Sequence, residues 1–374
     1  MQYRMLGRTG LKVSLLGFGA MRLPMDGDRV DREKAIPMIH RAFDAGVNYI
    51  DSAVGYCDGD SQRAVGDAIK GRRDEIVVST KNHHYDKNDE KGWWTNLEDS
   101  LERLQVDYID IYNFHGINWN GFTQNIDGPD GVYRHMLKAK DQGLIRHISC
   151  SFHDSCESLI KLVDTGMFES ITCQYNLLDR SNEKGIAHAH EKNVGIVIMG
   201  PVGGGRLGET GGEFAAALPE GVSSTPELAL RFVMANPNVT VALSGMSTMK
   251  QVEENILTAN REESLSAEER AAIAKAVRQL AEMADLYCTG CNYCQPCPQG
   301  VAIPEIFRLA NLYRVYGAKK TARDSYAGMI KQNRENHLPA TACVECGECE
   351  EKCPQNIKVI EQLKQAHELL TADE

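Results

Sequence analysis

Two kinds of hydrophobic pattern alternate along roughly the first 260 residues of the chain. Short runs rich in β-branched residues predict buried strands, and longer stretches with apolar residues every three or four positions predict amphipathic helices. The predicted strands are Val13–Phe18, Val47–Asp51, Ile76–Lys81, Tyr108–His115, Arg146–Ser151, Ser170–Tyr175, Gly195–Met199 and Val239–Ser244. The predicted helices include Arg32–Ala45, Ser61–Lys70, Trp93–Leu104, Val132–Gln142, Ser155–Thr165, Glu183–Lys192, Thr225–Ala235 and Thr248–Asn260.

Eight strands alternating with eight helices is the count of a (β/α)8 TIM barrel, an α/β fold. The alternative is an open doubly wound sheet, which would carry a glycine-rich phosphate loop between its first strand and first helix. Gly17 and Gly19 do not open such a loop, and Pro24 follows before any predicted helix. The pattern therefore favours the barrel.

Polar residues with distinct chemical roles stand at the ends of three successive predicted strands. Asp51 ends the second strand, with Tyr56 just beyond it, while Lys81 ends the third strand and His115 the fourth. In a TIM barrel the carboxyl ends of the strands carry the chemistry. Any one of these residues is more often structural, as a cap or a core residue, but the four together are harder to explain in that way.

The four side chains fit the reduction of a carbonyl by hydride, which needs a proton for the developing alkoxide. A phenol such as Tyr56 has a pKa near ~10, and we expect the adjacent Lys81 ammonium to lower it. A carboxylate at Asp51 would keep Lys81 charged. A neutral imidazole at His115 would donate a hydrogen bond to the carbonyl oxygen and polarise it.

With these motifs in order, the sequence resembles the aldo-keto reductase family. The segments that carry the resemblance are DSAVGYC at 51–57, GDSQRAVG at 59–66, VVSTK at 77–81, YNFH at 112–115, HISCSFHD at 147–154, QYNLLDR at 174–180, IMGPVGGGRL at 198–207 and LSGMSTMKQVEEN at 243–255. They span almost the whole predicted barrel. The resemblance implies Asp51, Tyr56, Lys81 and His115 as a catalytic tetrad in which Tyr56 is the general acid.

The resemblance also implies a site for NADP or NAD. By position, Ser151 and Gln174 would hold the nicotinamide carboxamide, and the backbone of Gly200, Pro201, Val202, Gly203 and Gly204 would pass beside the pyrophosphate. The residues that match the adenosine-end motif are Ser247, Gln251, Glu254 and Asn255. The alternative interpretation of this last segment is simple capping of a helix by Ser247 or Thr248.

Several positions depart from the family pattern. Phe152 follows Ser151 where asparagine is frequent, and Met199 stands where an aromatic residue usually stacks on the nicotinamide. Lys250 and Arg206 are the candidates for binding a 2′-phosphate, so the choice between NADP and NAD stays open. Six loop residues are candidates for lining the substrate pocket, the alternative being ordinary packing: His83, His84, Trp93, Trp94, Asn118 and Trp119.

Eight of the twelve cysteines form two quartets near the end of the chain. The first, CTGCNYCQPCP, contains Cys288, Cys291, Cys294 and Cys297, and the second, CVECGECEEKCP, contains Cys343, Cys346, Cys349 and Cys353. The second has the spacing of a bacterial ferredoxin run, and the first is one residue shorter before its last cysteine. Two 4Fe–4S clusters are expected, with a pair of zinc sites as the alternative. The scattered Cys57, Cys150, Cys156 and Cys173 are interpreted as inert thiols.

The segments around the cysteines predict a second, smaller domain. Ser266–Met283 has the pattern of one helix with Ser266 as its N-cap, and Ile303–Tyr316 and Thr321–Asn333 have helical periodicity. We expect the barrel at residues 1–262, a connecting helix at 263–284 and a mostly α-helical, ferredoxin-like iron–sulfur domain at 285–374. Together these features resemble the iron–sulfur-containing branch of the aldo-keto reductases.

Charge and hydropathy narrow the expected partners. The formal net charge is −11, from 41 Lys and Arg against 52 Asp and Glu. An acidic chain is poorly suited to nucleic acid, and it lacks an apolar run long enough to span a membrane. The polar start predicts no export signal, so a cytoplasmic location is expected.

The expected function is an NAD(P)-dependent oxidoreductase acting on a small carbonyl or alcohol. The alternative is an electron-transfer or redox-regulatory subunit whose barrel binds nucleotide without turnover of its own. Because a nicotinamide gives two electrons and a cubane cluster accepts one, the clusters are expected to serve a partner protein, for which a flavin-containing one is the candidate, with a mainly structural role as the alternative. The stretch from Arg308 to Arg334 has seven Lys or Arg and one Asp, which suits either a docking face or a solvated helix surface.

Overall fold

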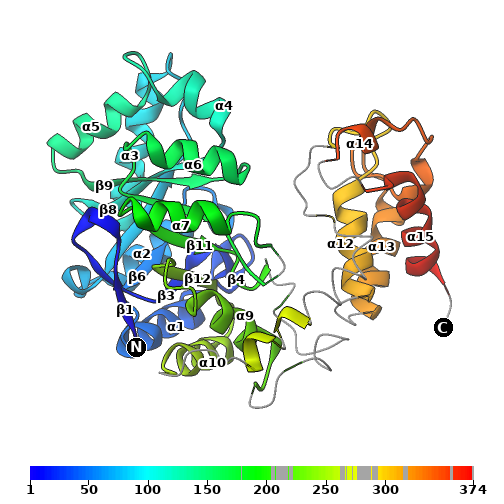
Figure 1. Cartoon of the computed structure of the whole chain (residues 1–374), viewed down its shortest axis with the longest axis horizontal. Helices are drawn as coiled ribbons and strands as arrows, with labels where there is room; N and C mark the ends of the chain where they lie inside the picture. The colour runs from blue at the N-terminus through cyan, green and yellow to red at the C-terminus, as the bar shows by residue number, and fades with distance from the viewer. Residues whose placement is uncertain are drawn as a thin grey trace. The chain divides into compact units, whose positions relative to one another are not determined.

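The chain forms two compact units, which we call the barrel unit and the tail unit. The computed structural model describes residues 1–177, 179–203, 222–261, 294–314, 319–353 and 357–372, with isolated positions between them (207, 218, 266, 268–271, 273–275 and 288). The barrel unit comprises Met1–Gly204 and Glu227–Leu265, and the tail unit comprises Gly205–Pro226 and Ser266–Glu374. Figure 1 shows the elements of both units along the chain.

Eight parallel strands close into a barrel, as the hydrophobic pattern predicts. The strand order around it is β10-β11-β12-β3-β6-β7-β8-β9. The strands are β3 (Leu16–Gly19), β6 (Tyr49–Asp51), β7 (Val77–Asn82), β8 (Ile109–Ile117), β9 (Ile145–Phe152), β10 (Ser170–Gln174), β11 (Gly195–Met199) and β12 (Val241–Gly245). Their carboxyl ends therefore meet at one rim.

Amphipathic helices follow the strands and cover the outside of the barrel (Figure 1). They are α1 (Arg32–Asp44), α2 (Ser61–Ile69), α3 (Glu90–Leu104), α5 (Tyr133–Asp141), α6 (Cys156–Asp164), α7 (Glu183–Glu191), α9 (Thr225–Met234) and α10 (Met249–Ala259). Side-chain caps explain several of the helix starts. Asp31, Asp89 and Ser155 each accept a hydrogen bond from the backbone N–H three residues later.

The start of the chain differs from the prediction. The expected strand Val13–Phe18 is divided into β2 (Lys12–Ser14), which pairs with β1 (Tyr3–Met5) in an antiparallel hairpin, and the barrel strand β3. The division falls at Ser14, whose hydroxyl donates to the Leu16 carbonyl at 2.7 Å. A continuous apolar run does not reveal this break, because it depends on pairing with residues outside the run.

The inside of the barrel is filled by side chains from many strands. Leu6, Val13, Tyr49, Val77, Ile111, Val197, Val241 and Leu243 form one buried cluster there. Gly17 leaves the space that this cluster needs, because a Cβ at residue 17 would stand 2.6 Å from Cγ1 of Val241. The barrel is thus a packed core whose chemistry is confined to its rim.

The tail unit is helical and has a hydrophobic core of its own. Its helices are α12 (Ile303–Arg314), α13 (Lys319–Gln332), α14 (Glu348–Glu351) and α15 (Val359–Thr371). The first two match predicted helices, and α15 was not predicted although Val359, Leu363, Ala366 and Leu370 recur at helical spacing.

Most of the predicted connecting helix lies outside the described residues. At its start, Ser266 Oγ accepts from Glu269 N at 3.1 Å and Glu269 Oε2 accepts from Ser266 N at 2.7 Å, which is a capping box. No helix among the described residues is long and apolar enough to cross a membrane.

Candidate active site and cysteine pocket

The structure brings Asp51, Tyr56, Lys81 and His115 together at the carboxyl rim of the barrel. Lys81 Nζ donates to Asp51 Oδ1 and, at 2.8 Å, to the Ser52 carbonyl. The same Nζ lies 4.7 Å from the centre of the Tyr56 ring. The rings of Tyr56 and His115 meet edge to face with their centres 6.0 Å apart. The four groups form one contiguous set.

A β-bulge places His115 in this set. Between the pairs Phe114 with Cys150 and Ile117 with Phe152, strand β8 has one residue more than strand β9. Gly116, inside the bulge, has a φ of +73°, which glycine adopts at little cost. Bulges bend a strand and re-aim its side chains, often beside active sites. The bulge accounts for the position of His115 beyond the regular pairing.

Two buried residues that the sequence analysis missed support the Lys81–Asp51 ion pair. Ser79 Oγ donates to Asp51 Oδ2 at 2.7 Å, and Asn113 Nδ2 donates to Ser79 Oγ at 3.0 Å and to the Thr80 carbonyl at 2.9 Å. Each precedes a tetrad residue by two positions in its strand, so each faces the same side of the sheet. This spacing of two residues could have identified both positions from the sequence.

The pKa values suit a protonated phenol beside a charged lysine and a neutral imidazole. Burial, with Lys81, His153 and His83 nearby, lowers the pKa of His115 to about 4. Burial lowers the pKa of Lys81, but Asp51 and Tyr56 outweigh it, and the net direction is upward. Burial raises the pKa of Tyr56 more than Lys81 lowers it.

The net shift of the Tyr56 pKa is opposite to the one expected from Lys81 alone. Lys81 acts in the expected direction, yet desolvation of the phenol is the larger effect. Tyr56 therefore stays protonated at neutral pH and retains a proton to donate.

Most of the predicted nicotinamide and pyrophosphate residues lie on the same rim as the tetrad. Ser151 and Gln174 are on β9 and β10, and Gly200–Gly203 follow β11 directly. Gly200 has a φ of +63°, and a Cβ there would stand 2.6 Å from Gln174 Nε2. Asn176, which is not among the predicted site residues, donates from Nδ2 to the Gly200 carbonyl at 3.1 Å. Gly204 and Arg206 lie outside the described residues.

The start of α10 is capped by its own side chains. Thr248 Oγ1 accepts from Gln251 N at 3.3 Å, and Gln251 Oε1 accepts from Thr248 N at 3.2 Å and from Ser247 N at 2.7 Å. Asn255 Nδ2 donates to Ser244 Oγ at 2.9 Å, and Glu254 pairs with Lys250 at 3.7 Å. The capping interpretation is thus realised by Thr248 with Gln251, and nucleotide binding by these residues stays a prediction.

The candidate substrate residues take different positions. Trp93 is fully buried and packs against Tyr112 and His135, so it belongs to the core. His83 is exposed just after β7, where Asn96 Nδ2 lies 3.1 Å from its Nδ1. Asn118 caps a short helix through a 2.7 Å hydrogen bond from Gly121 N.

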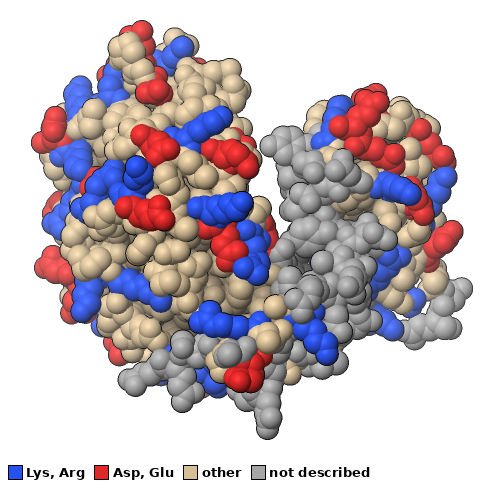
Figure 2. Space-filling view, in the orientation of Figure 1, with Lys and Arg blue, Asp and Glu red and all other residues tan. Residues whose placement is uncertain are grey.

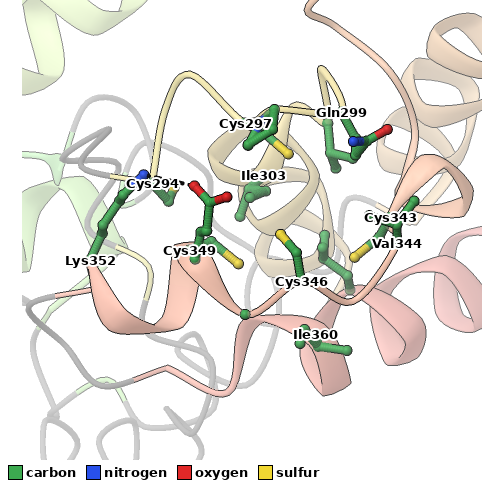
Figure 3. Close-up of a pocket in the computed structure, with 15 residues that line it drawn as sticks. Cys294, Cys297, Gln299, Ile303, Cys343, Val344, Cys346, Cys349, Lys352 and Ile360 are labelled. Carbon is green, nitrogen blue, oxygen red and sulfur yellow. Dashed lines mark hydrogen bonds and ion pairs between the residues drawn. The ribbon is translucent and has the colours of Figure 1, made fainter.

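Cysteines of both quartets line one pocket in the tail unit. Its walls include Cys294 and Cys297 of the first quartet and Cys343, Cys346 and Cys349 of the second. Figure 3 shows the sulfurs of Cys297, Cys343, Cys346 and Cys349 directed towards a common space, with Cys294 at one edge. Val301, Ile303, Ile360 and Leu363 supply an apolar lining.

The remaining cysteines of the quartets lie outside this pocket or outside the described residues. Cys288 and Cys353 pack against the core of the tail unit. Cys291 lies outside the described residues, and the described cysteines are all free of disulfides. Thiolates with an apolar surround are the ligands that an iron–sulfur cluster requires, so the residues present fit such a group.

Comparison with known proteins assigns a family to each part of the chain. Residues 15–278 match the model of the aldo/keto reductase family, and residues 287–357 match that of the 4Fe-4S dicluster domain. The L-galactose dehydrogenase of Arabidopsis thaliana is 29% identical over 289 residues, covering 71% of this chain and 90% of the relative. The uncharacterized oxidoreductase YqkF of Bacillus subtilis is 29% identical over 293 residues, covering 70% and 92%.

A solved structure shows the same similarity. The holo form of aldo-keto reductase AKR11C1 from Bacillus halodurans has a TM-score of 0.62 and 31% identity. It covers 74% of this chain and 96% of its own.

Proposed function

The chain belongs to the aldo/keto reductase family and carries a 4Fe–4S domain, and from its site we propose that the barrel interconverts a small carbonyl compound and its alcohol by hydride transfer with NADP or NAD. The observation that carries the proposal is the buried Lys81–Asp51 ion pair beneath the Tyr56 ring, with His115 beside it. These residues can supply a proton and polarise a carbonyl at one point of the rim.

In this mechanism the bound nicotinamide supplies or accepts the hydride. The Tyr56 hydroxyl gives its proton to the oxygen on which negative charge develops, and the Lys81 ammonium stabilises the phenolate that remains. Asp51, held by Ser79, keeps Lys81 charged and fixed. Neutral His115 donates a hydrogen bond to the substrate oxygen and orients it.

The nucleotide would lie along the strand ends from β9 to β12. Ser151 and Gln174 would hold the carboxamide, and the backbone of residues 200–204 would pass the pyrophosphate, where Gly200 leaves room beside Gln174. Ser247, Gln251, Glu254 and Asn255 would contact the adenosine end. Gln251 would then exchange its capping hydrogen bonds for contacts with the nucleotide.

For the tail unit we propose two 4Fe–4S clusters that exchange ligands between the quartets. Cys297 turns towards the space that Cys343, Cys346 and Cys349 also face, which supports one cluster on these four residues (Figure 3). The other would bind Cys288, Cys291, Cys294 and Cys353, as in two-cluster ferredoxins. An assay for iron and acid-labile sulfide distinguishes clusters from zinc.

The clusters would exchange single electrons with a flavin-containing partner protein in the cytoplasm. Figure 2 shows acidic side chains gathered over α14, which contains Glu348, Glu350 and Glu351. The basic stretch from Arg308 to Arg334 is the other candidate docking face. Two of its arginines already have partners within the tail unit: Arg308 pairs with Glu305 at 2.7 Å, and Arg323 donates to the Tyr313 hydroxyl at 3.0 Å.

Replacing the proposed proton donor tests the function. Tyr56→Phe should lower turnover by at least ~10²-fold in reactions that oxidise NADPH with a panel of aldehydes and ketones, with nucleotide affinity unchanged. Tyr133→Phe is the matched control, because that half-buried hydroxyl is outside the tetrad and donates to the Met167 carbonyl at 2.6 Å. Equal turnover of the two variants would remove Tyr56 from its role.

A further inference from the structure

The turn that carries Tyr56 has a strained backbone. In η3 (Tyr56–Gly59), Cys57 and Asp58 both have a φ of +52°, and Gly59 has a φ of +86°. Non-glycine residues in this left-handed region each cost on the order of 1–3 kcal/mol and persist only where the surroundings enforce them. Two in succession beside a proposed proton donor require an identifiable restraint.

The hydrophobic core supplies part of that restraint, because Cys57 packs against it. No residue from Gly55 to Asp60 is buried, although Tyr56 and Cys57 are partly covered. On its outer side the turn faces a polar pocket lined by Asp28, Arg29, Arg63 and others. Hydrogen bonds add to it: Cys57 Sγ donates to the carbonyls of Ala20 and Met21, each at 3.5 Å, and stronger bonds act at the end of the turn.

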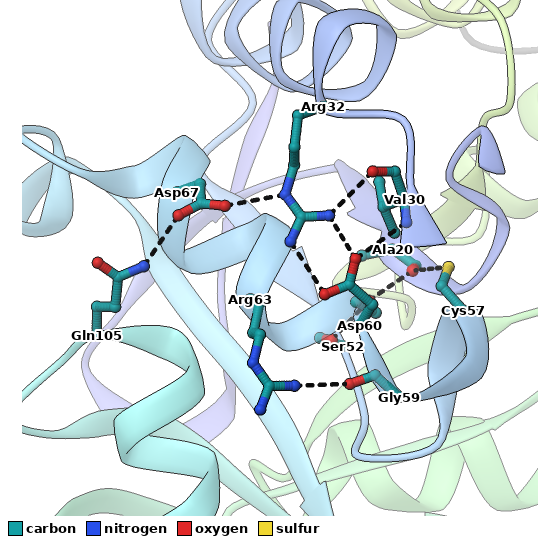
Figure 4. Close-up of polar contacts among 11 residues, drawn as sticks. Ala20, Val30, Arg32, Ser52, Cys57, Gly59, Asp60, Arg63, Asp67 and Gln105 are labelled. Carbon is teal, nitrogen blue, oxygen red and sulfur yellow. Dashed lines mark hydrogen bonds and ion pairs between the residues drawn. The ribbon is translucent and has the colours of Figure 1, made fainter. Parts of the chain in front are cut away.

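Asp60 and Arg32 provide the hydrogen bonds at the end of the turn. The Asp60 carboxylate accepts from Arg32 Nη1 at 2.6 Å and Nη2 at 3.1 Å, and from Val30 N at 3.0 Å. The Asp60 N–H donates to the Cys57 carbonyl at 2.9 Å and closes the turn. Figure 4 shows Asp60 held between the Arg32 guanidinium and Val30.

Arg32 is itself fixed by further partners. Its Nε donates to Asp67 Oδ2 at 2.9 Å on α2, and its Nη1 donates to the Val30 carbonyl at 3.1 Å. The side chains of Arg32 and Asp60 are only 29% and 14% exposed, so water competes weakly for the pair. The guanidinium thus joins the starts of α1 and α2 at the base of the Tyr56 turn.

We propose that Arg32 and Asp60 are positioning residues that hold the Tyr56 phenol in register with Lys81 and the substrate oxygen. The argument rests on the proposed function of Tyr56. Proton transfer depends steeply on geometry, and a displacement of about 1 Å can cost on the order of 10²-fold in rate. This Arg32–Asp60 pair, which we call the clamp, lies outside the tetrad and would act through the turn.

The decisive test is a double-mutant cycle on turnover. Arg32→Gln and Asp60→Asn should each lower kcat about 10- to 100-fold with the KM for the carbonyl and the nucleotide affinity little changed. In a Tyr56→Phe background the same substitutions should have no further effect, because they act through the missing hydroxyl. The α2 start keeps an independent anchor, since Ser61 Oγ still donates to the Ala20 carbonyl at 2.7 Å.

Arg72→Gln is the matched control. Arg72 is 27% exposed and pairs with Asp44 at 2.6 Å and Glu75 at 3.2 Å, away from the Tyr56 turn. A kcat for Arg32→Gln within twofold of that of Arg72→Gln would overturn the proposal. An equal loss with and without Tyr56 would overturn it as well.

A second measurement separates this proposal from the proposed function. Hydrogen exchange of the peptide 53–61, followed by mass spectrometry, should accelerate in Arg32→Gln and not in Arg72→Gln. If the wild-type protein turned over no carbonyl, the proposed function would fail while this comparison still tested the clamp. An unchanged exchange rate of this peptide in Arg32→Gln would show that the turn does not need the clamp.

Discussion

Replacing Lys81 by methionine should destabilise the barrel because it leaves Asp51 charged and buried. The side chains of Lys81 and Asp51 are 2% and 5% exposed, and Lys81 donates to both Asp51 and the Ser52 carbonyl. Methionine has a similar length without the charge. The perturbation therefore removes the counter-charge while it largely preserves the packing.

The loss in the free energy of unfolding depends on the hydrogen bonds that Asp51 retains in the variant. Breaking a buried ion pair by removing one partner costs about 3–5 kcal/mol. Asp51 retains the hydrogen bond from Ser79 Oγ at 2.7 Å, which places the expected loss near the lower value, ~3 kcal/mol. With a urea m-value of about 3 kcal/mol/M for a barrel of this size, the midpoint should fall by ~1 M.

Tryptophan fluorescence reports on the barrel alone, because all three tryptophans, Trp93, Trp94 and Trp119, precede the tail unit. The assay is urea unfolding of the full chain under anaerobic conditions, with fluorescence following the barrel and visible absorbance following the clusters. Lys81→Met should move the fluorescence transition to lower urea and leave the absorbance transition in place.

Lys34→Met is the control: the Lys34 side chain is 71% exposed where it pairs with Asp31 at 2.7 Å, so its loss should barely move the midpoint. The double variant Asp51→Asn with Lys81→Met should recover part of the loss, because no buried charge remains unpaired. Equal midpoints for Lys81→Met and Lys34→Met would refute the reasoning.

Three further predictions concern titration and ligand exchange. Because the pKa of His115 is about 4, its imidazole NMR signals, assigned with His115→Gln, should not move between pH 8 and pH 5.5; movement near pH 6.5 would contradict this. Burial raises the pKa of Glu169, but hydrogen bonds from His147 and Lys140 outweigh it and lower the pKa to about 2. The stability that the ionised carboxylate gives the fold is therefore present at neutral pH and is lost as the pH falls from about 4.5 towards 2. The urea midpoints of wild type and Glu169→Gln should converge over that range, and a constant difference would contradict it. Cys297→Ala should remove the same reduced-cluster paramagnetic signal as Cys346→Ala, and Cys353→Ala the same signal as Cys291→Ala. If Cys297→Ala instead removed the signal that Cys291→Ala removes, each quartet would be self-contained.

The parts of the fold that follow from local pattern were predictable from the sequence. Apolar runs such as Ile76–Lys81 and Gly195–Met199 mark strands that are buried on both faces, and capped helices follow them. Asp51, Lys81 and His115 could be placed together because parallel strands share a rim. The break at Ser14 was not predictable, because it depends on the pairing of β2 with β1 and on a hydrogen bond from Ser14 N to Asn48 Oδ1, just before β6.

The parts of the site that depend on tertiary surroundings could not be predicted. The net direction of the Tyr56 pKa follows from burial, which a neighbouring lysine in the sequence does not reveal. Arg32 and Asp60 are 28 residues apart and meet only because the Tyr56 turn folds back towards β5 (Arg29–Val30). Trp93 stands in a loop-flanking position but packs inward, since the first turn of α3 covers the core.

The fate of the transferred hydrogen tests the central claim most directly. The full protein is supplied anaerobically with NADPH deuterated at the transferring position of nicotinamide C4 and with a carbonyl substrate, and the product alcohol is analysed by mass spectrometry. Direct hydride transfer in the barrel predicts one deuterium on the carbinol carbon of each alcohol molecule and no bleaching of the clusters within the turnover time. Loss of the deuterium to water, together with cluster bleaching, would show that the electrons pass singly through the tail unit and would contradict the account.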